Sequence, residues 1–376
     1  MKSFAEPIYV TRPLLPPLEA VQRRLARVWE SGWLANNGLE HVELQRALRA
    51  YLGVPYLSLF TNGTIALLTA IRSFGLHGEV VTTPFTFAAT PHVLGWNGLT
   101  PVFADIDPDR LTLSPASVES RITSRTSAIL AVHVYGMPCD VERLQAVADR
   151  HGLRLIYDGA HAFGTRVNGR GIGTFGDATM FSFHATKLFH TAEGGALACG
   201  DEQRAREFDH LKNFGILGPE AVDVVGINGK MSELQAVIGL AVLDCLGDEI
   251  ARRETLVRTY RRLLGPLPGI TFTPELPGVE MVPQYCAVQI DEALFGTSRD
   301  GVFDMLRGYN VHARKYFYPL CSDFDCYRTL PSSAPDGLPV ASRVARQALC
   351  LPLYGALPET AVEQIAEAIA SVAARA

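Results

Sequence analysis

Short apolar segments alternate with helix-like segments between residues 56 and 161, and this alternation limits the folds open to the chain. The apolar segments occupy residues 56–60, 79–87, 100–107, 127–136 and 153–161. Helix-like stretches such as "TNGTIALLTAIRSFG" lie between them. Strands joined by helical crossovers form a mostly parallel sheet with helices on both faces. The pattern predicts an α/β fold, in which "ATMFSF" and "GALAC" add two further strands.

The chain after residue 230 has a different organisation. One or two long helices are expected from "KMSELQAVIGLAVLDCLGDEIARRETLVRTYRRLLG", and "PLPG" ends them. A strand at 284–291 and a C-terminal helix from Pro358 follow. A chain of 376 residues is long enough for two domains. We therefore expect a large α/β domain over 1–250 and a smaller α+β domain over 251–376.

Composition excludes several classes of partner. Hydrophobic residues make up 48% of the chain, charged residues 19%, and the formal net charge is −5. No basic block marks a surface for nucleic acid or membrane, and no apolar run approaches the ~18 residues of a membrane span. The N-terminus lacks the apolar core of a signal peptide. Seven scattered cysteines without a CxxC motif indicate reduced thiols and predict a cytoplasmic protein.

The segment "TNGTIAL" (61–67) predicts a phosphate cradle. Gly63 and Thr64 open a helix directly after a strand. Amide groups at a helix N-terminus point outward and favour negative charge, and Thr64 adds a hydroxyl. The alternative is an ordinary helix cap with no ligand.

The segment "LIYDGAHAFG" (155–164) places Asp158 at the end of an apolar strand. Ligands of α/β folds bind at the carboxyl ends of parallel strands, so a carboxylate there is a candidate site residue. His161 follows on the same turn. The alternative is that Asp158 caps the next segment and that His161 is a packing residue.

Lys187 lies in "MFSFHATKLFHTAEGGALAC", just after another predicted strand. Lysines usually point to solvent, which is the alternative interpretation. The neighbouring apolar residues, Phe183, Leu188 and Phe189, instead favour a lysine with a lowered pKa that can form a Schiff base. A phosphate cradle, a buried aspartate and such a lysine are the three groups that pyridoxal 5'-phosphate (PLP) requires.

Nearly the whole chain resembles the DegT/DnrJ/StrS family of sugar aminotransferases, which have the PLP-dependent aminotransferase fold type I. The resemblance is carried by "SGWLANNG", "NGTIALLTAI", "TTPFTFAAT", "PVFADID", "YDGAHAFG", "SFHATKLFHTAEGGAL" and "GINGKMSELQA". The form "SFHATK…EGGA" is most similar to the viosamine-type branch, which aminates C4 of a dTDP-4-keto-6-deoxyhexose.

The resemblance implies a role for each matched residue. Lys187 would carry the Schiff base and shuttle a proton, and Asp158 would pair with the pyridine nitrogen. His161 would lie near the phenolic oxygen of the cofactor, and Phe87 would stack on its ring. The alternative for Phe87 is core packing.

The resemblance also implies the phosphate site and the quaternary structure. Gly63, Thr64 and Ser182 would hold the phosphate of PLP. Asn228 would reach the same phosphate from a second chain, so the active sites would be shared within a homodimer. "GIN" would otherwise be only a turn.

The family resemblance suggests L-glutamate as the amino donor and a dTDP-linked keto sugar as the acceptor. The candidate substrate residues are His184, His190, Lys212, Arg314 and Tyr316. Lys212 and Arg314 are the candidates for binding the carboxylate of the donor. A metal site is not expected from His184 and His190, because no third ligand has suitable spacing.

Four alternative functions would need different residues at these positions. A C3-aminating enzyme of the same family is the nearest alternative. A PLP-dependent sugar dehydratase is disfavoured because such enzymes replace the lysine by histidine, and a non-catalytic sensor is disfavoured by the intact set of Lys187, Asp158 and phosphate loop. A Rossmann protein is disfavoured because no GxGxxG follows the first strand.

Overall fold

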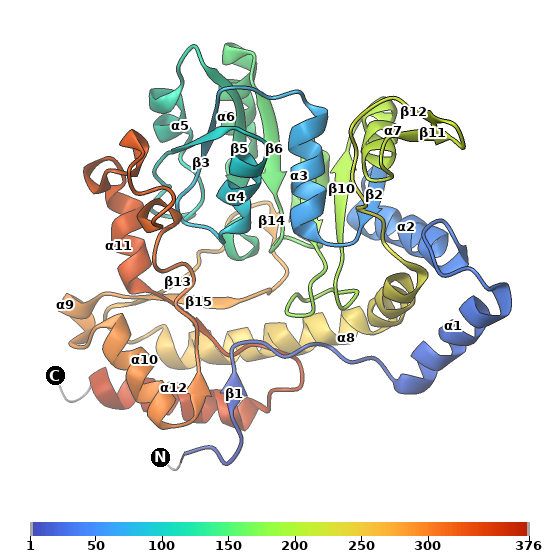
Figure 1. Ribbon diagram of the computed structural model, residues 1–376. Helices are drawn as coiled ribbons and strands as arrows, with labels where there is room; N and C mark the ends of the chain where they lie inside the picture. Colours follow the sequence, from blue (N-terminus) through green and yellow to red (C-terminus); the bar gives the residue numbers. More distant parts are fainter. Residues whose placement is uncertain (1–2, 374–376) are drawn as a thin grey trace.

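The computed structural model describes residues 3–373 and is built around a seven-stranded sheet (Figure 1). Its strands, in spatial order, are β2 (Tyr56–Phe60), β10 (Gly195–Cys199), β9 (Ala178–Ser182), β6 (Arg154–Asp158), β5 (Thr126–Val132), β3 (Glu79–Thr82) and β4 (Thr100–Phe103). All neighbours are parallel except where β10 pairs with β2 and with β9. The expected mostly parallel α/β sheet is confirmed.

Helices cover both faces of this sheet. Helices α3 (Gly63–Ser73), α4 (Ala89–Trp96) and α7 (Glu202–Leu211) bury their apolar side chains in a core on one face. Helices α2 (Leu39–Leu52), α5 (Pro115–Arg121) and α6 (Val141–His151) contribute to a core on the other face. Because both faces of the sheet are covered by helices, side chains on both faces of the central strands are buried. These strands therefore carry nearly continuous apolar runs rather than alternating ones.

Four of the five strands predicted between residues 56 and 161 end earlier than expected, at Thr82, Phe103, Val132 and Asp158. The segment 79–87 is a strand only to Thr82, because Pro84 has no amide hydrogen for the sheet. The side-chain hydroxyl of Thr83 accepts from the amide of Phe85 instead, at 3.1 Å. The segment 127–136 likewise leaves the sheet after Val132 and forms a short 3-10 turn. The segments that follow Thr82 and Val132 are therefore loops, not strands, near the end of β6.

The long helix predicted after residue 230 is a single helix, α8 (Glu233–Leu264). It begins with a capping box between Ser232 and Gln235, which satisfies two backbone donors of the first turn. In Figure 1, α8 runs below the large sheet and reaches the C-terminal elements. The predicted domain boundary at 250/251 falls inside this helix and stays a prediction.

The C-terminal elements pack around the second half of α8. They are a three-stranded antiparallel sheet of β13 (Ile270–Phe272), β15 (Cys286–Ile290) and β17 (Ala348–Leu351), together with α9 (Glu292–Phe295), α10 (Arg299–Gly308), α11 (Pro339–Gln347) and α12 (Glu359–Ala373). The N-terminal strand β1 (Ile8–Tyr9) pairs with β16 (Val311–His312) beside α10 and α12. The start of the chain is therefore held by its C-terminal part.

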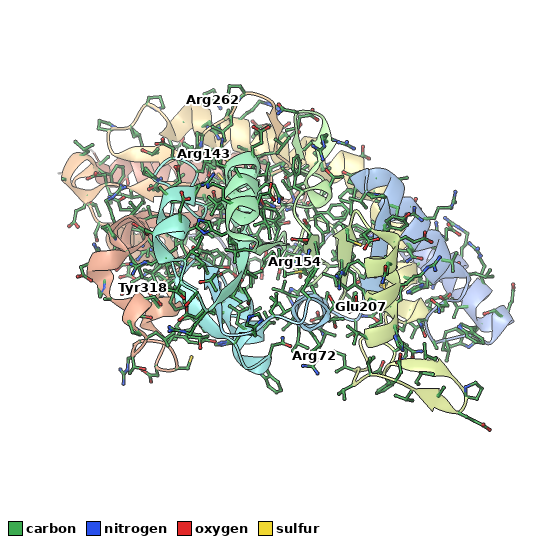
Figure 2. The ribbon with its side chains drawn as sticks, turned by 90° about the horizontal axis from the view of Figure 1, so that it is seen from above. Arg72, Arg143, Arg154, Glu207, Arg262 and Tyr318 are labelled. Carbon is green, nitrogen blue, oxygen red and sulfur yellow. The ribbon has the colours of Figure 1, made fainter. Side chains whose placement is uncertain are left out.

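The remaining elements lie at the edges of the molecule. Helix α1 (Leu18–Ser31) ends at Gly32, whose φ of 64° is the left-handed conformation that glycine adopts easily. The small strands are β7 (Arg166–Val167), β8 (Arg170–Gly171), β14 (Val279–Glu280) and the hairpin β11 (Ile216–Gly218) with β12 (Ala221–Val222). Exposed charges such as Arg72 and Arg143 lie on helix surfaces (Figure 2). Within residues 3–373, no helix has the length and apolar character needed to span a membrane.

Candidate functional site

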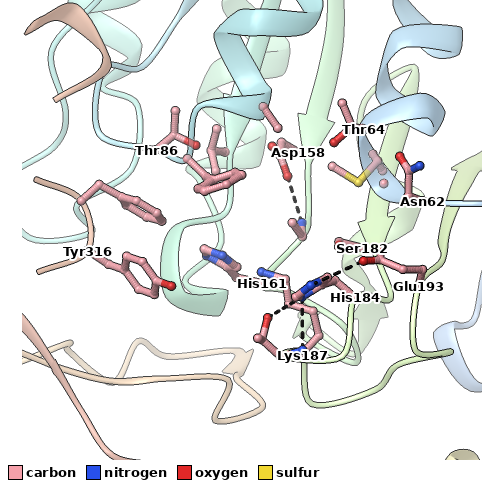
Figure 3. A pocket seen from close by; sticks show the side chains of 18 of the residues that line it. Asn62, Thr64, Thr86, Asp158, His161, Ser182, His184, Lys187, Glu193 and Tyr316 are labelled. Atoms are coloured by element: carbon pink, nitrogen blue, oxygen red, sulfur yellow. Dashed lines mark hydrogen bonds and ion pairs between the residues drawn. The ribbon is translucent and has the colours of Figure 1, made fainter. Parts of the chain in front are cut away.

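A cavity of about 600 Å³ lies at the carboxyl ends of β5, β6 and β9 (Figure 3). It brings together the predicted residues Gly63, Thr64, Phe87, Asp158, His161, Ser182, His184, Lys187 and Tyr316. It is also lined by residues that the sequence did not single out, including Asn62, Thr86, Thr186, Tyr285 and Phe317. The carboxyl edge of the sheet is where ligands bind in open α/β folds.

Asp158 is the last residue of β6 and is almost completely buried. Thr90 donates a hydrogen bond to its Oδ2 at 2.8 Å, and the amide of Ala160 donates to its Oδ1 at 3.0 Å. Burial raises the pKa of this carboxyl group, while the two donors and the charge of Lys187 lower it. A buried carboxylate with only neutral donors is suited to a cationic partner in the cavity.

Lys187 lies on the loop between β9 and β10, and its amide donates to the carbonyl of His184 at 2.8 Å. The neighbours Phe183, Leu188 and Phe189 are buried, as expected from the sequence. The Nζ atom lies 5.9 Å from the ring centroid of Tyr285. Burial lowers the pKa of Lys187 to about 8, against the opposing attraction of Asp158. A large neutral fraction near pH 8 makes this amine a nucleophile.

The side chain of Gln284 forms hydrogen bonds with the backbone of the loop on both sides of Lys187. Its Oε1 accepts from the amide of Leu188 at 2.8 Å, and its Nε2 donates to the carbonyl of Thr186 at 3.4 Å. The Gln284 side chain is buried. Both peptide groups next to Lys187 are therefore fixed by one side chain. The only signal in the sequence is a polar residue at the start of an apolar segment.

His161 packs among aromatic rings on the floor of the cavity. Its ring is stacked on Phe317, with centroids 5.8 Å apart, and meets Tyr285 edge-on at 5.0 Å. The amide of Tyr135 donates to Nδ1 at 3.3 Å. Burial and the nearby charge of Lys187 hold the pKa of His161 well below its usual value. The imidazole is therefore neutral, and acceptance at Nδ1 places its proton on Nε2.

The N-terminus of α3 forms another wall of the cavity. Asn62 is the cap residue, and its Oδ1 accepts from the amide of Ile65 at 2.8 Å. The amides of Gly63 and Thr64, in the first turn, have no partner within a helix. A Cβ on Gly195 would lie 2.6 Å from the Gly63 nitrogen, so only glycine lets β10 pass this close. The helix cap predicted as the alternative is therefore present on Asn62, while the amides of Gly63 and Thr64 lie at the cavity, where the anion cradle stays a prediction.

Two residues predicted to face the substrate are instead turned into the protein. His190 is buried, with Nε2 at 2.8 Å from the carbonyl of Leu14 and Nδ1 accepting from the amide of Ala192. Lys212 is buried, pairs with Asp209 and lies 5.2 Å from the ring centroid of Phe60. Neither lines the cavity, because each already has its polar partners elsewhere.

The other predicted residues occupy different positions. Asn228 is exposed, outside the cavity of its own chain, and its backbone pairs with Asn213. Arg314 lines a neighbouring cavity with Tyr316. His184 lies at the cavity rim, with Nδ1 at 2.8 Å from the hydroxyl of Thr186 and Nε2 at 3.6 Å from Oε1 of Glu193 (Figure 3).

The residues present fit PLP. The cavity holds an amine of lowered pKa, that of Lys187, and a buried carboxylate, that of Asp158, with no cationic hydrogen-bond donor. It also holds the N-terminus of α3, where there is little room for a side chain: a Cβ on Gly63 would lie 3.0 Å from Sδ of Met180. These are an amine for the aldehyde, an acid for the ring nitrogen and donors for the phosphate.

The sequence profile of the DegT/DnrJ/EryC1/StrS aminotransferase family matches residues 18–370. The chain is 44% identical over 361 residues to the dTDP-4-amino-4,6-dideoxy-D-glucose transaminase of Escherichia coli, covering 95% of this chain and 96% of the relative. It is 40% identical to the transaminase of the same name from Shigella dysenteriae, covering 98% and 99% of the two chains.

Solved structures agree with these relatives. The crystal structure of DesI in the presence of its TDP-sugar product superimposes with a TM-score of 0.95 at 40% identity, covering 100% of this chain and 95% of DesI. The fold type expected from the sequence is thereby confirmed. The protein is a member of the DegT/DnrJ/EryC1/StrS aminotransferase family.

Proposed function

We propose that this PLP-dependent aminotransferase moves the amino group of L-glutamate to C4 of dTDP-4-keto-6-deoxy-D-glucose. One observation carries the proposal: Lys187, Asp158 and the N-terminus of α3 line a single cavity. The two transaminases at 44% and 40% identity support the sugar and the carbon atom. The donor is inferred from the family resemblance.

The residues that would hold the cofactor follow from the cavity. Lys187 would bind PLP covalently through Nζ, and Asp158 would pair with the protonated ring nitrogen. Phe87, which is 61% exposed at the cavity, has a free ring face for stacking. Gly63, Thr64 and Ser182 would receive the phosphate. When bound, PLP supplies an electron sink for the carbon that loses its proton.

The protein's own groups would control the proton and the water in the site. Lys187, once free, has an Nζ of pKa about 8 that can both accept and return a proton near neutral pH. His161 would act as a neutral hydrogen-bond donor through Nε2. The rings of Phe317, which is buried, and Tyr285, which is partly buried, line the same cavity and would exclude water from it.

We also propose a homodimer in which each active site uses Asn228 of the other chain. The supporting observation is an exposed apolar group on and beside the hairpin β11–β12, where Leu217 and Val222 are each 66% exposed and Val225 is 82% exposed. Exposed apolar groups of this kind are typical of subunit interfaces. A second copy of this chain would cover them and would bring its Asn228 to the phosphate site of the first chain.

A mixing experiment tests the shared site. Lys187→Ala and Asn228→Ala homodimers should each be weak enzymes. Subunits exchanged between them should recover partial activity, because one site of each mixed dimer then has both intact residues. No recovery in a mixture that light scattering shows to be dimeric would place Asn228 in the site of its own chain.

A cytoplasmic location is proposed from the thiols. All seven cysteines are free, and Cys321 is buried while Cys326 is exposed. Unpaired thiols persist in a reducing compartment. Fractionation of cells that produce the protein, with thiol labelling, tests this location.

Product analysis tests the reaction. The purified protein, loaded with PLP and given L-glutamate, should convert dTDP-4-keto-6-deoxy-D-glucose to the 4-amino sugar, identified by mass and NMR. Lys187→Ala is the matched inactive control. Turnover of only a 3-keto sugar would support the C3-aminating alternative. Loss of a hydroxyl without amination would indicate a dehydratase, and absence of any turnover would favour a sensor.

A further inference from the structure

The amino group of Lys187 has no carboxylate in contact with it. Within residues 3–373, no ion pair involves Nζ of Lys187, and the charge of Asp158 acts on it without such a contact. Two other lysines with little exposed surface differ in this respect. Lys212 pairs with Asp209 and Lys315 pairs with Asp300, each at 2.5 Å. Some other group must therefore hold the Lys187 side chain when it is not bonded to a ligand.

The ring of Tyr285 is in the right place to do so. Nζ of Lys187 lies over this ring, 5.9 Å from its centroid. The face of an aromatic ring carries partial negative charge and attracts a cation within about 6 Å. Tyr285 directly follows Gln284, whose side chain is bonded to the backbone on both sides of Lys187. Two consecutive residues thus act on the same lysine, one on its backbone and one on its side chain.

Neighbouring aromatic rings fix the orientation of Tyr285. The rings of His161, Tyr316 and Tyr135 meet it nearly at right angles, with centroids 5.0, 5.6 and 6.3 Å away. Edge-to-face pairs of this kind are favourable. Burial also raises the pKa of the Tyr285 hydroxyl, so the ring is a neutral phenol. The surface that Tyr285 presents to Lys187 is therefore a fixed, uncharged ring.

A neutral ring suits this lysine better than a carboxylate. A carboxylate in contact with an ammonium group raises the pKa of that group and keeps it charged. The attraction of a ring is weaker, so burial can still lower the pKa of Lys187 to about 8. The amino group can then be held in one place and still give up its proton near neutral pH.

We propose that Tyr285 is a positioning residue that holds the amino group of Lys187 over its ring whenever this lysine is not bonded to the cofactor. The inference rests on the proposed function, because it requires Lys187 to be released from PLP and to move a proton in each half-reaction. Asp158 is then occupied by the ring nitrogen of the cofactor. Tyr285 and Lys187 line the same cavity, so an amine held there stays beside the reacting atoms.

The capture of PLP by the cofactor-free protein tests the contact without any turnover. Tyr285→Phe keeps the ring, and 3,4,5-trifluorophenylalanine at position 285 keeps its shape while fluorine withdraws electrons from its face. The pH midpoint of capture should be unchanged in Tyr285→Phe. It should fall by about half a pH unit with the fluorinated ring and in Tyr285→Leu, because the ammonium form loses its partner. Capture near pH 7 should then be about threefold faster.

A ring–cation pair elsewhere in the chain provides the matched control. Arg49 lies over the ring of Tyr56 at 5.8 Å, outside the cavity, and Tyr56→Leu should keep the wild-type midpoint. Circular dichroism checks that each variant is folded. In the PLP-loaded enzyme, the fluorinated ring at position 285 should slow the glutamate half-reaction about tenfold, since the group that moves the proton is no longer held in place. Faster capture together with slower turnover is a pattern that a loss of structure cannot produce.

Each remaining outcome is decisive. Equal midpoints for the phenylalanine and trifluorophenylalanine proteins would overturn the inference. A higher midpoint in Tyr285→Leu would also overturn it, because the ring would then act only by excluding water. Failure of the wild-type protein to capture PLP at Lys187, or to aminate a keto sugar, would instead overturn the proposed function. That result is read from the wild type alone.

Discussion

The hydroxyl of Thr90 donates a hydrogen bond of 2.8 Å to Oδ2 of Asp158. Thr90 is itself 2.9 Å from the hydroxyl of Thr86, so the two threonines form a chain that ends on the carboxylate. Thr90 comes from the first turn of α4, and Asp158 from the end of β6. The contact therefore sets how the carboxylate is presented to the cavity.

Replacing Thr90 by Val should lower kcat about tenfold. The change keeps the shape of the side chain but leaves Oδ2 without its donor, and a hydrogen bond to a charged group contributes about 1.5–3 kcal/mol. Thr90→Ser keeps the hydroxyl and is the matched control. Steady-state kinetics with L-glutamate and the keto sugar measure the difference. Equal kcat values in the two variants would show that the contact has no part in presenting Asp158.

Asp158→Asn should lower kcat by at least about a hundredfold, the scale of losing a preorganised electrostatic partner in a closed site. The amide has the size of the carboxyl group but cannot stabilise a positive charge on the ring nitrogen. Single-turnover absorbance with L-glutamate measures the effect directly. Asp140→Asn changes an aspartate at the N-terminus of α6, outside the cavity, and serves as the control. A variant within threefold of wild type would contradict the pairing.

Gln284→Met should lower both the stability and the activity of the enzyme. The change keeps an unbranched side chain of similar length but leaves the amide of Leu188 buried without its 2.8 Å acceptor. An unsatisfied buried donor costs about 1–3 kcal/mol in the free energy of unfolding. Urea unfolding measures this cost, and the position of the cofactor absorbance band reports on the loop of Lys187. Gln203→Met on the surface of α7 is the control. An unchanged absorbance band would show that Gln284 acts on stability alone.

The strands that lead to Asp158 and Lys187 were predictable from the sequence because apolar runs mark them, although several strands end earlier than predicted. Asp158 and Lys187 follow such runs on neighbouring parallel strands, β6 and β9, so topology alone brings them to one edge. Gln284 was not predictable as their partner, because it lies 96 residues beyond Leu188 and carries no motif. Proximity in sequence was also a poor guide to orientation: His184 lies at the cavity rim, whereas His190, six residues on, is turned inward toward Leu14.

The neighbouring cavity lined by Tyr9, Arg314 and Tyr316 could not have been predicted either. Strand β1 has only two residues, Ile8 and Tyr9, which is too short for a recognisable alternation. Its pairing with β16 joins segments about three hundred residues apart, and only the folded chain places Tyr9 beside Arg314.

The capture of PLP by the cofactor-free protein should speed up as pH rises through about 8. Attack on the aldehyde needs the neutral amine, and burial lowers the pKa of Lys187 to about 8 in the folded protein. Below this pH, each unit of acidification should slow capture about tenfold, because the neutral fraction falls by that factor. Above it the rate should level off.

The stability of the folded cofactor-free protein should also rise with pH over this range. The pKa of Lys187 in the folded state lies below that in the unfolded state, so the folded protein gains stability as pH rises from about 8 toward 10.5. Stopped-flow absorbance after mixing with PLP measures the rate, borohydride reduction followed by peptide mass analysis locates the cofactor, and Lys187→Ala provides the background. A midpoint near the ordinary lysine pKa would contradict a half-buried Lys187 with a lowered pKa.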